Sequence, residues 1–262
     1  MPGSSRSDPS LEEHPLKAEP SAQLELLNLQ GLDARADQLR HQRATLPELA
    51  EIAEIEKRRT DVDNRARDAR IAVDDLTAEQ AKVDADVEAV KARRTRDRDR
   101  MDQGLITNPK DLERMQHELE SLERRISTLE DEELEVMARL EDAQRDLDAL
   151  TAQVAEADEQ LATLATARDA KLAEIDAELT TVVADRDPVA AGLPDDLLAL
   201  YDKLRAQKGG VGAAELRQRR CTGCQLGIDN AELAVIAAAP DDQVIRCEEC
   251  SRILVRTPES GL

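Results

Sequence analysis

Two long stretches of this chain repeat apolar residues every seven positions. From Ile52 to Met101, two rows of mostly apolar residues run seven apart, one row three residues ahead of the other. A cleaner pair of rows runs from Leu112 to Leu164, with Glu133 as the main exception. Such rows form the contact seam of a coiled coil because residues three and four apart lie on one face of a helix. The pattern therefore predicts two long helices with one apolar seam each.

Signals for helix ends predict how these two helices are connected. Residues 45–48 read Thr-Leu-Pro-Glu, which fits a capping box with the threonine as cap. Residues 104–109 combine a glycine suited to a left-handed C-cap with an Asn-Pro helix start. So short a turn predicts an antiparallel hairpin over residues 21–190, with its tip at 104–109. Equal lengths counted from the turn place Val83 beside residues 126–129.

A slip in the seam predicts a joint in the hairpin. After Leu164 the apolar rows continue only after an extra four-residue step, a stutter that locally unwinds a supercoil. Counted from the tip, residues 164–172 fall opposite the break at 45–47. We therefore expect a joint near these two segments, with residues 21–44 pairing with about 168–186.

The two ends of the chain differ from this long hairpin. Residues 1–20 are rich in Pro, Ser and Gly and are predicted to be a disordered tail. Asp187-Pro188 and Gly192-Leu193-Pro194 are expected to end the coiled coil. A short helix over 196–207, with Tyr201 on its packing face, then opens a C-terminal region, 191–262, that contains every cysteine.

The composition supports long helices over a large globular core. The 262 residues include no Phe, no Trp and one Tyr, and 35% of them are charged. Fifty-seven acids against 36 bases give a net charge of −21, which opposes non-specific binding to nucleic acid. No apolar run approaches the ~20 residues that span a bilayer, and the N-terminal segment lacks an apolar signal-peptide core. We therefore expect a cytoplasmic protein without membrane contact.

The four cysteines carry the clearest chemical signal. Cys221 and Cys224 form one C-x-x-C pair, and Cys247 and Cys250 form a second pair after an interval of 22 residues. Each pair lets one tight turn present two thiolates, and two such turns complete a tetrahedral metal site. Because four sulfur ligands leave no position for water or substrate, the pattern predicts a structural site rather than a catalytic one.

Zinc is the metal that this site predicts, with one structural Zn²⁺ ion per chain. A disulfide and a redox dithiol are weaker alternatives because thiols stay reduced in the cytosol, and iron is the main competing metal. Residues 211–256 are predicted to form a small β-rich ribbon, too short and too poor in aromatic residues to fold unaided. Metal binding, worth on the order of 10–16 kcal/mol in comparable peptides, supplies the missing stability.

Arginines gather in two places that suggest contact with a partner. In the ribbon the candidates are Arg217, Arg219, Arg220, Arg246, Arg252 and Arg256, and near the hairpin tip they are Arg93, Arg94 and Arg96. One interpretation is contact with RNA, DNA or an acidic protein. The other, which we favour at the tip, is ion pairing with acids across the hairpin. In the ribbon the absence of aromatic stacking platforms weakens the nucleic-acid interpretation without removing it.

The order of these parts resembles the bacterial family of coiled-coil proteins with a C-terminal four-cysteine zinc ribbon. The matching segments are the tip at 108–112, the helix at 197–204, the Gly209-Gly210 entry and the ending 246–255; Ser251 departs from the glycine that the family often has. This resemblance implies a nucleic-acid-binding or adaptor role. Some such proteins resemble factors that engage an alternative sigma factor or aid flagellar and secretion assembly.

The sequence thus predicts a mostly α protein: a long antiparallel coiled-coil hairpin with a small C-terminal β-rich zinc ribbon. No nucleophile–base pair or phosphate loop stands out in it, so we expect neither enzyme activity nor a small-molecule substrate. The preferred function is a non-enzymatic adaptor that binds a protein partner through the hairpin and the ribbon. The alternative is a regulatory protein that binds RNA or DNA through the basic residues of the ribbon and tip.

Overall fold

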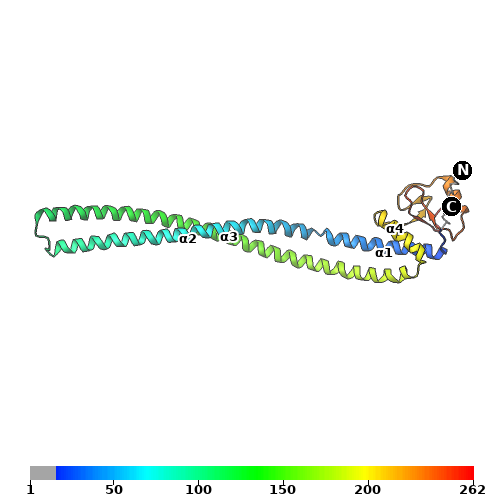
Figure 1. The fold of residues 1–262 in the computed structure, drawn as a ribbon, viewed down its shortest axis with the longest axis horizontal. Helices are drawn as coiled ribbons and strands as arrows, with labels where there is room; N and C mark the ends of the chain where they lie inside the picture. Colours follow the sequence, from blue (N-terminus) through cyan, green and yellow to red (C-terminus); the bar gives the residue numbers. More distant parts are fainter. Residues whose placement is uncertain (1–15) are drawn as a thin grey trace, which may run out of the picture. The chain divides into compact units, whose positions relative to one another are not determined.

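The computed structural model describes residues 16–262 (Figure 1). Its helices are α1 (Pro20–Ala44), α2 (Pro47–Asp102), α3 (Pro109–Ala191), α4 (Asp195–Gln207) and α5 (Asn230–Ala238). The chain divides into two compact units. One, here called the arm, is Pro47–Ala167; the other, the ribbon unit, joins the described residues up to Leu46 with Arg168–Leu262. Within the described residues, no helix has the length and apolar character needed to cross a membrane.

The arm is the predicted antiparallel coiled-coil hairpin. Helix α2 spans 56 residues, about 84 Å, and runs alongside the first part of α3 (Figure 1). Every seam position from Ile52 to Met101 and from Leu112 to Leu164 is buried or half-buried. Exposed ion pairs flank the seam, among them Arg139 with Glu79 (3.3 Å). Such pairs contribute under ~1 kcal/mol each, so the apolar seam stabilises the hairpin.

The tip of the hairpin has the predicted caps. Gly104 has a φ of +68°, and its amide donates to the carbonyl of Met101 while the amide of Leu105 donates to that of Arg100. This pair of bonds is a Schellman motif, which satisfies the last carbonyls of α2. Asn108 caps α3, since its side-chain oxygen accepts from the amide of Lys110 at 3.0 Å.

The predicted register of the hairpin is wrong by about two helical turns. Glu79 pairs with Arg139, and Lys91 pairs with Glu130. Val83 lies between these two levels of α2, so it lies opposite a stretch of α3 beyond residues 126–129. The count assumed that both helices meet the turn at the same level. In the structure the first turns of α3 extend past the end of α2.

Two predicted helix ends also differ from the structure. Thr45 does not cap α2. Its hydroxyl donates to the carbonyl of His41 one turn back, because Leu46 separates Thr45 from the first residue of α2. Pro188 does not end α3, which continues to Ala191. Only three residues of α3 follow Pro188, and Ala190 is buried in the core of the ribbon unit, so packing holds this last turn.

In the ribbon unit, α1 packs against the last part of α3. Ala36, Leu39 and Val182 form one apolar cluster, and Arg35 pairs with Glu178 beside it. A larger core joins α1, the end of α3, α4 and one face of the sheet. Tyr201 of α4 is fully buried in this core. The tyrosine is therefore the packing residue that the sequence predicted between helices and ribbon.

The start of α1 changes the predicted extent of the N-terminal tail. Residues 1–15 lie outside the described part of the chain, but residues 16–20 are ordered, contrary to the prediction of a tail over 1–20. Lys17 forms an antiparallel bridge with Gln243, and Ala18 is buried. Amide–carbonyl bonds on both sides of Lys17 join this segment to residues 242–244. It therefore behaves as a short strand beside the sheet.

The ribbon is a four-stranded sheet that bears one helix. Its strands are β1 (Ala213–Arg217), β2 (Arg220–Cys221), β3 (Ile245–Arg246) and β4 (Ile253–Arg256), in the order β2-β1-β4-β3, with β1 and β4 parallel. Successive side chains of a strand point to opposite faces. Ile253 and Val255 accordingly join the helical core, whereas Leu254 faces α5 and the cysteines. The helical core thus completes a module too small to fold unaided.

Candidate metal centre

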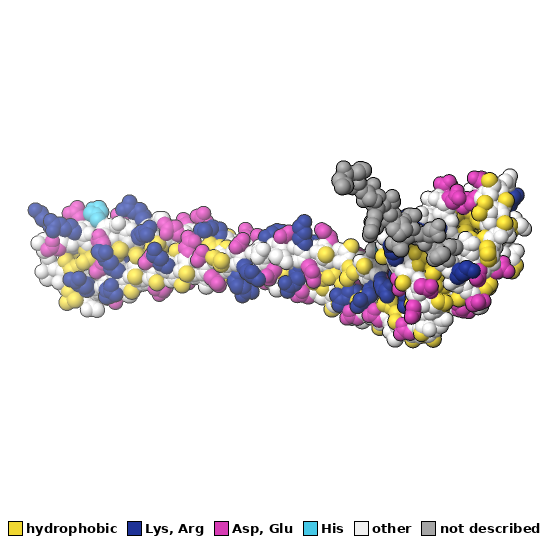
Figure 2. All heavy atoms as spheres, turned by 45° about the vertical axis from the view of Figure 1, so that its right-hand side comes forward, with side chains coloured by type: hydrophobic (Ala, Val, Ile, Leu, Met, Phe, Trp, Pro, Cys, Tyr) yellow, Lys and Arg dark blue, Asp and Glu magenta, His cyan; other side chains and the backbone are white. Residues whose placement is uncertain are grey.

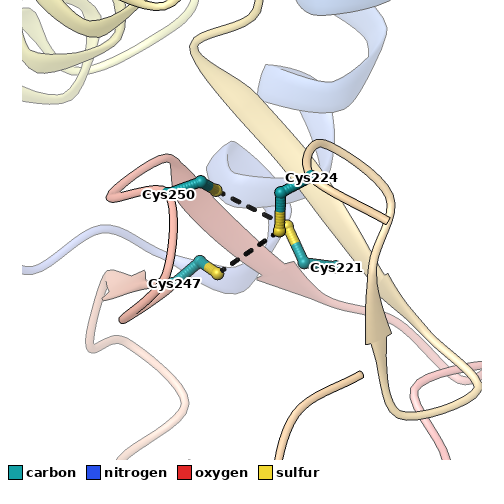
Figure 3. Close-up of side chains that lie close together, drawn as sticks. All are labelled: Cys221, Cys224, Cys247 and Cys250. Atoms are coloured by element: carbon teal, nitrogen blue, oxygen red, sulfur yellow. Dashed lines mark hydrogen bonds between the residues drawn. The ribbon is translucent and has the colours of Figure 1, made fainter. Parts of the chain in front are cut away.

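Two turns of equivalent backbone present the four cysteines. Cys221 and Cys224 come from the turn after β2, and Cys247 and Cys250 come from the turn between β3 and β4. In both turns the amide of the first cysteine donates to a carbonyl five residues ahead, that of Leu226 or Arg252. The carbonyl of the same cysteine accepts from the amide four residues ahead, that of Gln225 or Ser251. In Figure 3 the four side chains converge from the two turns on one point.

The spacing of the sulfur atoms fits a tetrahedral zinc ion. All four Sγ atoms lie within 4.8 Å of one another. The Cys221–Cys250 and Cys224–Cys247 distances between sulfurs are 3.9 and 4.0 Å (Figure 3). A zinc–sulfur bond of about 2.3 Å in tetrahedral geometry requires sulfurs about 3.8 Å apart. The four cysteines are therefore positioned to bind a metal ion, and four sulfurs fill all its positions.

Each turn contains one residue in the left-handed region, and neither is glycine. Gln225 has a φ of +62° and Ser251 a φ of +63°, and each directly follows the second cysteine of its pair. Gly223 and Gly227 lie in or next to the first turn, but neither has a positive φ. A side chain at Gly223 would instead meet Arg252 and Ala214 at under 3 Å. Gly223 is therefore required for close packing.

The thiols differ in how readily they lose a proton. Burial raises the pKa of Cys221, and it raises that of Cys247 to about 12. For Cys250, burial is outweighed by hydrogen bonds from the backbone and side chain of Arg252 and from two neighbouring cysteines, which lower the pKa to about 7.

Arg252 ties the metal centre to the helices of the ribbon unit. Its guanidinium donates to the carbonyls of Lys208 and Val211, both at 2.9 Å, on the link between α4 and β1. This arginine was predicted as a contact for nucleic acid or a partner. The structure places it inside the ribbon unit, between the second cysteine turn and the Gly209-Gly210 link.

The remaining ribbon arginines do not converge into one free patch. Arg256 donates to five backbone carbonyls between residues 236 and 243. Arg217 pairs with Glu259 (2.8 Å), Arg219 donates to Asn230 (2.8 Å), and Arg246 donates to the carbonyl of Ser251 (3.1 Å). Arg220 is exposed on β2. Internal partners thus occupy most of the predicted basic set.

At the tip, two of the three predicted arginines pair across the hairpin. Arg93 contacts Glu118 at 2.6 Å, and Arg94 contacts Glu123 at 2.9 Å. Arg96 is exposed, and among the described residues it has no ion pair. Figure 2 shows Lys and Arg side chains interspersed with Asp and Glu along the arm. The ion-pair interpretation therefore fits Arg93 and Arg94 and leaves Arg96 exposed to solvent.

Sequence reasoning missed a buried polar cluster beneath the ribbon. The carboxylate of Asp33, a residue only 3% exposed, accepts from the Tyr201 hydroxyl and from Nε of Arg186, each at 2.7 Å. Arg205 lies 3.5 Å away and also pairs with Asp37. Burial, and then the bond to Asp33, raises the pKa of Tyr201 well above its ordinary value. Nothing in the sequence distinguishes Asp33 from the other acids of its helix.

Comparisons with known proteins agree with this architecture. Residues 29–209 match the model of the CT398-like coiled coil hairpin domain, and residues 220–254 match that of the C4-type zinc ribbon domain. The uncharacterized protein Rv2229c of Mycobacterium tuberculosis is 38% identical over 252 residues, covering 92% of this chain and 98% of the relative. The uncharacterized protein ML1638 of Mycobacterium leprae is 30% identical over 225 residues, covering 85% and 95%.

Two solved structures share the fold. One from Mycobacterium smegmatis has a TM-score of 0.81 and 38% identity, covering 92% of this chain and all of the other. CT398 from Chlamydia trachomatis has a TM-score of 0.68 and 16% identity, covering 90% and 98%, a likeness of fold alone. The family resemblance seen in the sequence is confirmed: the chain belongs to the CT398-like coiled-coil hairpin family and carries a C4-type zinc-ribbon domain.

Proposed function

We propose that this chain is a non-enzymatic cytoplasmic adaptor, in which one structural Zn²⁺ ion folds the ribbon while the arm and the ribbon bind macromolecular partners. The observation that carries the proposal is the all-sulfur centre. Four cysteine sulfurs within 4.8 Å of one another fill a tetrahedral ion completely. An ion so enclosed supplies stability and shape, which leaves the surfaces of the two units to act on partners.

A metal assay on the full chain tests the first part. Zinc measured after exhaustive dialysis is expected at one ion per chain, and Cys221→Ser with Cys224→Ser should abolish retention. Two results would contradict the assignment of a structural zinc ion. One is a native chain that retains almost no zinc, and the other is retention of iron in preference to zinc from a mixture of the two metals.

Protein partners are favoured over nucleic acid because few basic groups are free. The guanidinium groups of Arg252 and Arg256 donate hydrogen bonds to backbone carbonyls, and Arg217 forms an ion pair with Glu259. Arginines whose donors are already occupied offer phosphate few hydrogen bonds, and the chain as a whole is strongly acidic. Near the end of the arm, three exposed arginines, Arg96, Arg98 and Arg100, have no ion pair within the described residues.

Charge reversal on the arm tests whether its tip binds a partner. The variant Arg96→Glu, Arg98→Glu, Arg100→Glu is compared with a control on the same helix, Lys57→Glu, Arg65→Glu, Arg70→Glu, which makes the same change in charge at exposed positions. Crosslinked capture from cytosol, quantified by mass spectrometry, should lose specific partners in the first variant and keep them in the second. Equal capture by both would argue against a partner at the tip.

Nucleic-acid binding remains the second candidate because those same tip arginines are unpaired. Anisotropy with labelled single-stranded RNA and duplex DNA, titrated with salt, separates it from the adaptor function. A steep salt dependence, flattened by the tip variant or by substitutions at Arg217, Arg219 and Arg220, would favour it. No binding at low salt would exclude it.

A further inference from the structure

A groove crosses the ribbon unit between the start of α1, the end of α5 and the segment after β4. Its volume is about 500 Å³, within the range of sites that bind ligands. Pro20, Leu24, Ala237, Pro258 and Leu262 give it an apolar lining. Leu24 is 46% exposed, although it belongs to a helix whose other leucines are mostly buried. The described residues thus leave this apolar surface uncovered.

The outer face of α5 extends this surface. Leu233 and Ile236 on its inner face are buried against the sheet. The solvent side is also apolar: four exposed residues at spacing i, i+3, i+4 and i+7 are Ala231, Ala234, Val235 and Ala238. Val235 is 69% exposed. A helix apolar all round is normally covered, and Ala237, one turn from Ala234, joins this face to the groove.

The most exposed charges at the rim of the groove are negative. Gln23 lines it, but its amide already donates to the carbonyls of Ala18 and Asp241. Arg256 also lines it, but its side chain is only 14% exposed: the guanidinium donates to backbone carbonyls and lies 4.0 Å from the carboxylate of Asp241. The Asp241 side chain is 93% exposed, and the exposed Glu19 immediately precedes Pro20. Figure 2 shows hydrophobic side chains beside Asp and Glu on this unit.

We propose that the groove and the outer face of α5 bind a short amphipathic helix of a partner protein, with Lys or Arg flanking its apolar face. The alanines of α5 let a second helix approach closely, and Leu24 and Val235 supply larger apolar contacts. Asp241 and Glu19 select positive charge at the rim. The inference rests on the proposed adaptor function, for which it names the chemistry of one partner.

The charge at the rim argues against other occupants. Phosphates of a nucleic acid would meet exposed carboxylates, because Arg256, the cation that lines the groove, is only 14% exposed. The groove also has no aromatic residue in its lining for stacking. Anionic lipid surfaces attract polybasic segments, whereas this rim is acidic. A basic peptide helix satisfies both the apolar floor and the acidic rim.

The test uses the full, zinc-loaded chain and two synthetic peptides followed by fluorescence anisotropy. Both fluorescein-labelled peptides carry leucine at i, i+3, i+4 and i+7; one has flanking lysines and the other has glutamates instead. The variants are Leu24→Glu, Val235→Glu and Asp241→Lys. Leu134→Glu is the matched control, since Leu134 is a similarly exposed leucine (64%) on the arm. Zinc content and Tyr201 fluorescence report that each variant keeps its fold.

The lysine peptide is expected to bind at least tenfold more tightly than the glutamate peptide. Leu24→Glu and Val235→Glu should each weaken binding of the lysine peptide at least tenfold, whereas Leu134→Glu should change it less than twofold. Asp241→Lys should reduce the difference in affinity between the lysine and glutamate peptides. Should Leu24→Glu misfold, Val235→Glu still decides, because the side chain of Val235 is 69% exposed and its replacement is expected to leave the fold intact. Absence of binding to the native chain, or equal binding by native chain and Val235→Glu, would overturn the proposal.

Other occupants and the adaptor function are separated by parallel measurements. If the native chain self-associates in sedimentation velocity and Val235→Glu abolishes this association, the groove binds a second copy of the chain and the partner-helix proposal is wrong. If the native chain floats with phosphatidylcholine–phosphatidylglycerol vesicles and Val235→Glu does not, the groove binds lipid and the partner-helix proposal is wrong. If capture from cytosol yields the same partners with native chain and Val235→Glu, the groove proposal fails and the adaptor function stands. If the peptide results hold but no partner is captured, the adaptor function fails instead.

Discussion

Raising the pH above 10 is expected to unfold the ribbon unit before Tyr201 can lose its proton. The tyrosine is fully buried, and its hydroxyl lies 2.7 Å from the carboxylate of Asp33, a second charge that a tyrosinate would face. Burial, and then the bond to Asp33, raises the pKa of Tyr201 far above its ordinary value near 10. The native state therefore keeps this proton under conditions in which the unfolded chain has released it.

The sign and size of the effect follow from proton linkage. Above pH 10 the unfolded state binds one proton fewer than the native state, so the free energy of unfolding falls as the pH rises. One proton corresponds to about 1.4 kcal/mol per pH unit. In Tyr201→Phe this contribution disappears. Above pH 10 the free energy of unfolding of the variant should therefore fall less steeply than that of the native chain, by about 1.4 kcal/mol per pH unit. At neutral pH the same variant should lose about 1.5–3 kcal/mol, the value of a hydrogen bond to a charged group.

The assay is unusually clean because the chain has one tyrosine and no tryptophan. Absorbance at 295 nm follows tyrosinate, and circular dichroism with urea follows unfolding of native chain and variant at each pH. The absorbance should rise only together with unfolding of the ribbon unit. An ordinary titration near pH 10, with the secondary structure and zinc content of the chain unchanged, would refute the burial and the bond to Asp33.

Three further outcomes are expected. Cys221→Ser with Cys224→Ser should release zinc and speed amide exchange throughout the ribbon while the arm keeps its helicity, and exchange that rises equally in the arm would contradict the two-unit division. Replacing both Gln225 and Ser251 by glycine should raise the melting temperature of the ribbon unit. A left-handed conformation costs a residue other than glycine roughly 1–2 kcal/mol, whereas the extra freedom of glycine in the unfolded chain costs about 0.5–1 kcal/mol. An unchanged or lower melting temperature in calorimetry would show that these two residues are not strained. Asn108→Ala should destabilise the arm by about 1 kcal/mol in urea unfolding, because it removes the bond to the Lys110 amide, and no change would mean that the cap is replaceable.

Features that depend on local pattern could be predicted from the sequence. The seam residues of α2 and α3 repeat every seven positions, and burial follows that repeat throughout the arm. The spacing of the four cysteines is typical of a metal site, and their sulfurs do lie together in the structure: Cys221, Cys224, Cys247 and Cys250. In both cases a short-range rule of geometry fixes the outcome, whatever the rest of the chain does.

Features that depend on long-range contacts could not be predicted. Val83 was placed at the wrong level because the heptad repeat permits any register that keeps the seams together, and only the packed turn selects one. Asp33 looks like any surface acid until α3 and α4 supply Arg186 and Tyr201. The left-handed turns at Gln225 and Ser251 carry no glycine to mark them. Tertiary structure imposes these conformations on residues that do not prefer them.

The ribbon unit is built from two pieces that are distant in the sequence, and this affects how the chain is made. Helix α1 packs against α3, α4 and the sheet, whose last strand along the chain ends at Arg256. At about 5–20 residues per second, a ribosome needs on the order of 10–40 s to add the roughly 210 residues between Leu46 and Arg256. During that interval the arm can close on itself, while Leu26 and Leu29 of α1 lack at least part of the core that buries them. Newly synthesised chains would thus expose an apolar helix that chaperones could bind, and completion of the ribbon would end that exposure.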